Sequence, residues 1–144
     1  MLSAQLVPSM VIWLEGDLGA GKTTLVRAIL KSAGETGAVK SPTYTLVEVH
    51  PISGLNFYHF DFYRFTAAEE YLDAGLDEYF DGAGICLVEW PDKAAPYLAG
   101  ADLRILLSAA SDGDEAKRIS RFIANTGRGE QCLNAIFPLS GAPP

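Results

Sequence analysis

The chain has 144 residues, a formal net charge of −7 and a hydrophobic content of 49%. These values fit one globular domain that buries a core without disulfide or metal support, and they exclude an intrinsically disordered chain. The acidic balance also argues against a protein that grips nucleic acid unaided, because phosphate binding needs a basic surface. We expect a single domain over residues 1–144, with residues 1–9 and 138–144 peripheral or flexible.

Targeting signals and cysteines bear on the cellular compartment. No apolar run is long enough to cross a membrane. The first fifteen residues contain neither Lys or Arg nor a long apolar segment, so no secretory signal is expected. Cys86 and Cys132 lie far apart and match no metal or redox spacing, which indicates reduced thiols. We therefore expect a cytoplasmic protein without membrane attachment.

The first half of the chain predicts a strand, a helix and a hairpin. Met10–Leu14 is an apolar run followed closely by glycine, which indicates a buried strand. A helix is predicted over Lys22–Ala33, because apolar residues recur at helical spacing and a glycine follows. Thr45–His50 and Leu55–Phe62 are rich in β-forming residues. They are separated by Pro-Ile-Ser-Gly, so we expect a β-hairpin with its turn there.

The second half continues the alternation of helix and strand. Ala67–Ala74 is a predicted helix with acidic residues in its first turns. Ile85–Val88 indicates a buried strand, and Leu103–Leu107 and Arg118–Ile123 indicate two later strands around a polar turn at Ser111–Glu115. Alternating strands and helices with one β-hairpin predict an α/β domain with a mainly parallel sheet.

The strongest functional signal is a glycine-rich run between the first strand and the helix. It consists of Gly16, Asp17, Leu18, Gly19, Ala20, Gly21, Lys22 and Thr23, followed by Thr24. The run fits the pattern G-x-x-x-x-G-K-[ST], whose glycines let successive N–H groups face an anion at a helix N-terminus. Lys22 would bridge the β- and γ-phosphates of ATP, and Thr23 would complete a Mg²⁺ shell. We expect the three-layer fold of P-loop NTPases.

A P-loop ATPase also needs an acid that holds the metal through water, usually at the end of a buried strand. Glu89 follows four apolar residues, and Asp61 also ends a β-rich run. The residue pattern favours Glu89 for the metal, because its strand is the more apolar of the two. Either acid could instead cap a loop or pair with a nearby cation such as Arg64.

Several other polar or aromatic residues have two interpretations. The hydroxyls of Ser41–Leu46 could meet the γ-phosphate, as a switch loop does, but the pattern alone favours a Ser-Pro turn before an edge strand. His59 lies in an aromatic strand and is predicted to be a core or hairpin residue rather than a base. His50, beside a proline, is predicted at the surface. Trp90 fits either a packed strand end or a stacking and partner-contact residue.

Missing motifs narrow the function further. No Asn-Lys-x-Asp guanine motif is present, which disfavours a standard GTPase. Only Arg27 and Arg64 lie near the predicted site, whereas a small-molecule kinase generally needs arginines to clamp a second phosphorylated substrate. The residues leave a compact nucleotide hydrolase or switch as the main hypothesis. The alternatives are a nucleotide-gated adaptor with negligible turnover and a small-molecule kinase.

Four blocks in this order carry a family resemblance. They are Gly16–Thr24, Ser41–Leu46, His59–Arg64 and Leu87–Pro91. Together they resemble the bacterial TsaE (formerly YjeE) family of ATPases in tRNA threonylcarbamoyladenosine biosynthesis. The P-loop is generic, whereas the other three blocks at these distances are specific. The resemblance implies a small domain that binds and slowly hydrolyses ATP with Mg²⁺. It also implies association with the TsaD–TsaB pair, which transfers the threonylcarbamoyl group to tRNA, so tRNA is reached only indirectly.

The resemblance also assigns roles residue by residue. Lys22 and Thr23 keep their P-loop roles, and Glu89 matches a second magnesium-linked acid. Asp61 becomes a candidate for positioning the attacking water, and Thr43 falls in a switch-like loop, which replaces the simple turn interpretation.

The resemblance also concerns Trp90, Arg118 and the start of the chain. The resemblance places Trp90 near the nucleotide, and Arg118 on a late strand could reach it. The family usually has a strand and a helix before the P-loop strand, whereas few residues precede Val11 here. We therefore expect either a shortened start or a base pocket that is built differently.

Overall fold

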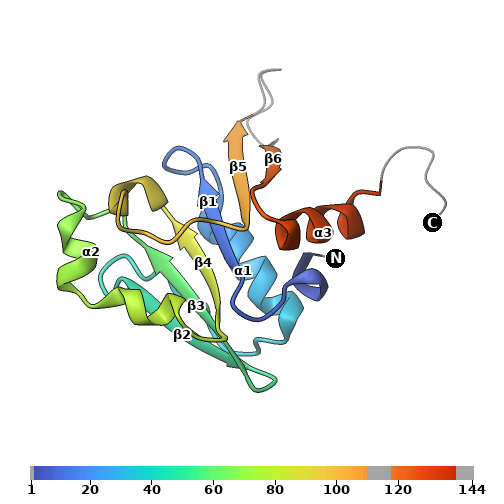
Figure 1. The fold of residues 1–144 in the computed structure, drawn as a ribbon, viewed down its shortest axis with the longest axis horizontal. Coiled ribbons are helices and arrows are strands. Elements are labelled where there is room, and N and C mark those ends of the chain that lie inside the picture. Colours follow the sequence, from blue (N-terminus) through green and yellow to red (C-terminus); the bar gives the residue numbers. More distant parts are fainter. Residues whose placement is uncertain (1, 110–117, 139–144) are drawn as a thin grey trace.

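Residues 2–109 and 118–138 are described in the computed structural model, and they form one central sheet with helices packed against it (Figure 1). The strands are β1 (Val11–Glu15), β2 (Val47–Ile52), β3 (Leu55–Asp61), β4 (Ile85–Glu89), β5 (Leu103–Ala109) and β6 (Arg118–Ala124). The α-helices are α1 (Lys22–Ala33), α2 (Glu69–Asp73) and α3 (Gly127–Ile136). Short 3₁₀ turns are η1 (Leu2–Gln5), η2 (Leu76–Phe80) and η3 (Pro91–Ala94). Within these described ranges, no helix has the length and apolar character that a membrane crossing requires.

The sheet has the order β2-β3-β4-β1-β5-β6. Its four inner strands are parallel, and an antiparallel strand closes each edge. The predicted α/β fold with a mainly parallel sheet is therefore confirmed. The β2–β3 hairpin forms one antiparallel edge of the sheet, and the β5–β6 pair forms the other. The polar turn predicted at Ser111–Glu115 lies outside the described residues. Because parallel strands share a direction, β1, β3 and β4 all end at the edge where α/β sheets bind ligands.

The hairpin turn is shorter than predicted. β2 continues through Pro51 to Ile52, which pairs with Leu55. An edge strand tolerates a proline, because its outer side needs no ladder hydrogen bond. The turn itself is Ser53-Gly54, with φ angles of 52° and 80°. Positive φ at both central residues is typical of the two-residue turns that match strand twist.

His50 is buried, so the prediction that it lies at the surface is wrong. It alternates with exposed neighbours along β2 and faces inward with Ile52. Its Nδ1 lies 2.5 Å from Oε1 of Glu35, in the loop after α1. Side chains of a strand alternate between its two faces, and this alternation buries His50 although a proline follows it.

Two apolar clusters hold the sheet between its helical layers. α1 contributes Val26, Ile29 and Leu30 to one cluster, which also contains inward-facing residues of β1, β4 and β5. The other cluster contains Phe60 of β3 and Tyr71 of α2, both fully buried. The predicted helix over residues 67–74 is thus present as the shorter α2. Together the two clusters fix β1 at the centre of the sheet, directly before the P-loop.

The predicted elements do not include α3, which packs beside β6 and η1 (Figure 1). Asp102, buried before β5, holds this helix in place. Its Oδ1 accepts a hydrogen bond from the Thr126 hydroxyl at 2.7 Å, and its Oδ2 accepts from Arg128 at 3.2 Å and from the Val11 amide at 2.8 Å. Thr126 in turn caps α3 by accepting the amide of Gly129. One carboxylate therefore joins the central strand to the last helix.

Glycine at position 129 is required by this close packing. A Cβ there would lie 2.0 Å from the carbonyl oxygen of Asp102, whereas a Cβ on Gly127 would meet nothing within 4 Å. We expect Gly129→Ala to lower the free energy of unfolding by about 1–3 kcal/mol, the usual cost of overpacking. Gly127→Ala is the matched control and should leave stability unchanged or slightly raised. Urea unfolding measures both, and equal stabilities for the two variants would contradict the packing argument.

Candidate functional site

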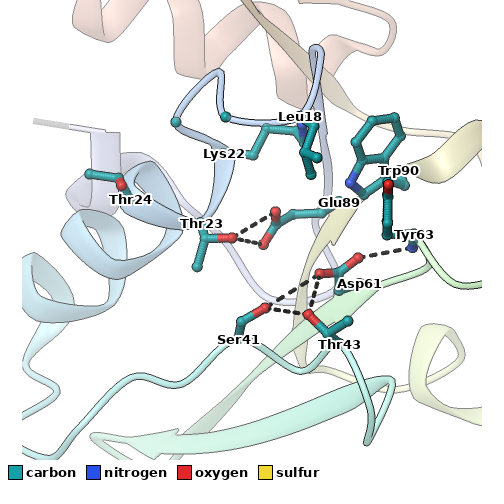
Figure 2. A pocket seen from close by; sticks show the side chains of 12 residues that line it. Leu18, Lys22, Thr23, Thr24, Ser41, Thr43, Asp61, Tyr63, Glu89 and Trp90 are labelled. Atoms are coloured by element: carbon teal, nitrogen blue, oxygen red, sulfur yellow. Dashed lines mark hydrogen bonds between the residues drawn. The ribbon is translucent and has the colours of Figure 1, made fainter.

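A cavity of about 380 Å³ opens where β1, β3 and β4 end (Figure 2). Its lining comes from the P-loop, the loop before β2 and the ends of β3 and β4. The lining residues are Leu18, Gly19, Gly21, Lys22, Thr23, Thr24, Ser41, Thr43, Asp61, Tyr63, Glu89 and Trp90. All four sequence blocks thus converge on one cavity. Ser41 was considered only among the hydroxyls of its loop, and Tyr63 was not singled out, although it lies within one of those blocks.

Two glycines of the P-loop have backbone conformations that other residues rarely adopt, and one of them packs closely against β5. Gly16 has a φ of 151°, and a Cβ there would lie 2.4 Å from the carbonyl oxygen of Leu107. Gly21 has a φ of 104° directly before the first turn of α1. These conformations are open to glycine and strained for other residues. The loop can therefore turn tightly from the central strand into the helix.

Lys22 lies inside the loop rather than in solvent and is 4% exposed. Its Nζ donates hydrogen bonds to the carbonyl oxygens of Gly16 and Asp17, at 2.6 and 2.9 Å. The ammonium also lies 4.1 Å from the ring centroid of Trp90. Burial lowers the pKa of Lys22, and the charge of Glu89 opposes that shift. The site thus holds a positive charge in place on the cavity wall.

A chain of hydrogen bonds starts on the cavity wall, at Thr23 and Glu89, and continues to His59, which is not part of the lining. The Thr23 hydroxyl donates to both carboxylate oxygens of Glu89, at 2.9 and 3.0 Å (Figure 2). His59 Nε2 lies 2.6 Å from Glu89 Oε2. His59 is buried, as its aromatic strand predicted, but its contact with Glu89 was not foreseen. The one available signal was its spacing of two residues from Asp61, which places both on one face of β3.

Asp61 lies beside Glu89 at the end of the neighbouring strand, with the loop hydroxyls facing it (Figure 2). Its Oδ1 accepts the Tyr63 amide at 2.9 Å, and its Oδ2 accepts the hydroxyls of Ser41 at 3.4 Å and Thr43 at 3.3 Å. Burial is the main cause that raises the pKa of Asp61 above its ordinary value of 3.8. The Glu89 charge adds to that rise, and the Tyr63 amide opposes it.

Arg64, the cation considered as a partner of Asp61, instead contacts Tyr44. Its guanidinium donates to the Tyr44 hydroxyl at 2.9 Å and lies 4.2 Å from the ring centroid. The loop at residues 41–46 does contain a turn, because the amide of Leu46 donates to the Pro42 carbonyl oxygen. It is therefore both a turn and part of the cavity wall.

A second cavity of about 530 Å³ adjoins the other side of the P-loop. It is lined by Gly19, Ala20, Gly21, Thr24, Leu25, Ala28, Leu107, Arg118, Ser120 and Phe122. Arg118 therefore lies beside the P-loop but outside the first cavity. Gly19, Gly21 and Thr24 line both cavities, so the two cavities share part of the P-loop as a wall.

The raised pKa of Asp61 has a consequence for stability. Because folding favours the protonated carboxyl, ionised Asp61 destabilises the protein as the pH rises from 3.8 through the raised pKa. We expect Asp61→Asn to raise the free energy of unfolding at neutral pH, and the gain to shrink as the pH falls. Urea unfolding across this range measures it, with Asp73→Asn at an exposed position of α2 as the control for charge. A less stable Asp61→Asn protein at neutral pH would contradict the burial argument.

Comparisons with known proteins agree with this arrangement. A family model described as "Threonylcarbamoyl adenosine biosynthesis protein TsaE" matches residues 1–119. The chain is 43% identical over 128 residues to the tRNA threonylcarbamoyladenosine biosynthesis protein TsaE of Haemophilus influenzae, covering 89% of this chain and 78% of that protein. It is 43% identical over 107 residues to the Bacillus subtilis protein of the same name, covering 74% of this chain and 66% of that one.

The fold has a solved relative as well. The crystal structure of Bacillus subtilis YdiB matches with a TM-score of 0.77 and 36% identity, covering 94% of this chain and 82% of that chain. The family match extends over the P-loop and all three of the other blocks that meet at the first cavity. A P-loop fold, these blocks and the extent of the match lead to one conclusion: the chain belongs to the TsaE family of threonylcarbamoyl adenosine biosynthesis proteins.

Proposed function

We propose that this protein is a Mg²⁺-dependent ATPase that supports threonylcarbamoyladenosine modification of tRNA next to the anticodon, acting with the TsaD–TsaB transferase in the cytoplasm. The observation that carries the ATPase proposal is the convergence of Lys22, Thr23, Asp61 and Glu89 on one cavity. A cation, a hydroxyl and two carboxylates at the N-terminus of α1 are the groups that ATP hydrolysis by a P-loop protein requires.

The phosphates of ATP are proposed to lie on the P-loop against Lys22. Its ammonium is already on the cavity wall, and it would exchange the carbonyl oxygens of Gly16 and Asp17 for phosphate oxygens. The first turn of α1 adds backbone N–H groups and the positive end of the helix dipole. The second cavity, beside Arg118 and Phe122, is proposed to receive the adenosine part, because it is larger and shares the P-loop wall.

The donor set fits magnesium. Within the described ranges, no group of three or more His, Cys, Asp or Glu side chains could hold a metal by itself. Mg²⁺ in ATP sites usually takes one or two protein oxygens, with phosphates and waters as the other ligands. Thr23 would supply its hydroxyl oxygen directly, since its hydrogen is donated to Glu89. Glu89 would hold the metal-bound water, and the ion would neutralise charge on the phosphates.

Asp61 is proposed to orient the attacking water. Its carboxylate lies in the cavity wall with Ser41 and Thr43 donating to one oxygen. A raised pKa makes this carboxylate a better proton acceptor than an exposed aspartate. The loop hydroxyls, 2.8 Å apart, can exchange these hydrogen bonds for contacts with the γ-phosphate or the water.

Two features support dependence on a partner. Lys22 is the one cation among the described residues that line the first cavity, so little positive charge is available for the transition state. Apolar side chains at and beside the cavity are unusually exposed: Leu18 by 72%, Tyr44 by 80% and Tyr63 by 41%. Exposed apolar groups gathered beside a site favour a protein interface. TsaD and TsaB are the proposed partners, and we propose that they, rather than this acidic chain, hold the tRNA.

The first test is phosphate release from Mg-ATP, measured for the protein alone and with purified TsaD and TsaB. We expect slow release alone and a marked increase with the pair. Nucleotide-dependent binding to the pair without any release would contradict an ATPase and favour the adaptor. Transfer of phosphate to an added acceptor rather than to water would favour the kinase.

Lys22→Ala should abolish phosphate release, because the substitution removes the cation that lines the first cavity. Lys31→Ala is the matched control, since Lys31 lies on the last turn of the same helix and is exposed. The control should retain the wild-type rate. Unchanged release by Lys22→Ala would remove the P-loop from the mechanism.

Glu89→Gln should weaken binding of the Mg²⁺ complex of ATP more than binding of ATP without metal. The variant keeps the size of the side chain and removes the charge that would hold the metal-bound water. Calorimetry with a non-hydrolysable ATP analogue, with and without Mg²⁺, separates the two effects. Equal losses under both conditions would count against a metal role for Glu89.

A further inference from the structure

His59 is fully buried, yet it is not simply a packing residue. Its relative exposure is 0%, and its Nε2 lies 2.6 Å from Glu89 Oε2. The other ring nitrogen, Nδ1, is buried and has no hydrogen-bond partner within the described ranges. A buried polar group without a partner is unfavourable, so an apolar residue would pack here at lower cost. The hydrogen bond to Glu89 therefore accounts for a histidine at this buried position.

The register of the parallel strands produces this contact. His59 lies opposite Leu87, and Asp61 lies opposite Glu89. Alternation along β3 puts His59 and Asp61 on the same face, and the imidazole reaches diagonally to the carboxylate two residues further along β4. Both acids of the cavity and the histidine thus share one face of the sheet.

Glu89 is held by donors from two different elements. The Thr23 hydroxyl approaches from α1, and the His59 ring approaches from β3. A carboxylate oxygen accepts in this contact when the ring hydrogen lies on Nε2, and we assign the hydrogen there. These two donors fix both the position and the plane of a carboxylate that is 2% exposed.

We infer that His59 is a positioning residue for the magnesium site: its Nε2–H holds the Glu89 carboxylate in the orientation that serves Thr23 and the metal-bound water. The inference rests on the proposed role of Glu89. Groups that hold a metal-linked side chain from behind commonly change metal affinity about 10–100-fold when removed. His59 would act through hydrogen-bond geometry, without touching the nucleotide.

The test compares His59→Phe, which removes the donor, with His59→Gln, which can place an amide N–H near Nε2. Calorimetry with a non-hydrolysable ATP analogue gives the ratio of affinities with and without Mg²⁺. We expect His59→Phe to reduce this ratio about 10–100-fold while metal-free binding is kept, and His59→Gln to restore most of it. If His59 served packing alone, the ratio of affinities with and without Mg²⁺ would stay at the wild-type value in both variants.

His50 supplies a matched control. It is another buried histidine in the β2–β3 hairpin with a glutamate partner, but that partner is Glu35, away from the cavity lining. His50→Phe should keep the wild-type ratio. An equal loss in His50→Phe would overturn the inference, because the effect would then follow from disturbing any buried histidine.

The outcomes separate this inference from the proposed function. A wild-type protein that binds the analogue equally with and without Mg²⁺ would overturn the metal site and this role with it. A wild-type protein with a large Mg²⁺ effect that His59→Phe retains would overturn the role of His59 alone.

One measurement needs no variant, which matters if His59→Phe fails to fold. Nitrogen-15 NMR of the wild-type imidazole identifies the nitrogen that carries the hydrogen. We expect it on Nε2 of His59, with the Nε2–H signal shifted when Mg²⁺ and the analogue bind. A hydrogen on Nδ1 alone would overturn the inference, since Nε2 could not then donate to Glu89.

Discussion

The hydrogen bonds from Thr23 to Glu89 fasten the first turn of α1 to the end of β4, and the site depends on this connection. The P-loop connects β1 to α1. β1 is paired with a strand on each side, and α1 is held by the hydrogen bonds from Thr23 to Glu89. A buried carboxylate is stable only with donors around it. Thr23 and His59 meet that need, so the interaction that makes Glu89 tolerable in the interior also sets the shape of the cavity.

Much of the fold could be predicted because it follows from local patterns. The apolar run before the P-loop, the helical spacing after it and the glycines between them specify β1, α1 and their connection within one short stretch of chain. The meeting of Asp61 and Glu89 also follows, since both end parallel strands. The residue pattern favoured Glu89 for the metal because its strand is the more apolar, and the register places the two acids side by side. The hydrogen bonds from Thr23 to Glu89 support the role proposed for Glu89, and they arise only in the packed structure.

The features that could not be predicted from the sequence depend on contacts between residues far apart in the chain. α3 is held by Asp102, which bonds to Val11 and to Arg128 across 91 and 26 residues. The contact between His59 and Glu89 requires the strand register, which no single segment contains. Arg64 could be placed near the site but not on Tyr44, because a stacked pair on an exposed loop leaves no periodic signal.

The contacts of Lys22 also bear on which anions the P-loop attracts. Its ammonium rests on two carbonyl oxygens and the face of Trp90, so it presents almost no charge to solvent. An isolated anion at the surface offers little in exchange for those contacts, whereas a polyphosphate offers several oxygens along the whole loop. In a protein that carries a net charge of −7 and is proposed to work beside tRNA, this arrangement would keep the proposed nucleotide-binding cation away from the RNA backbone.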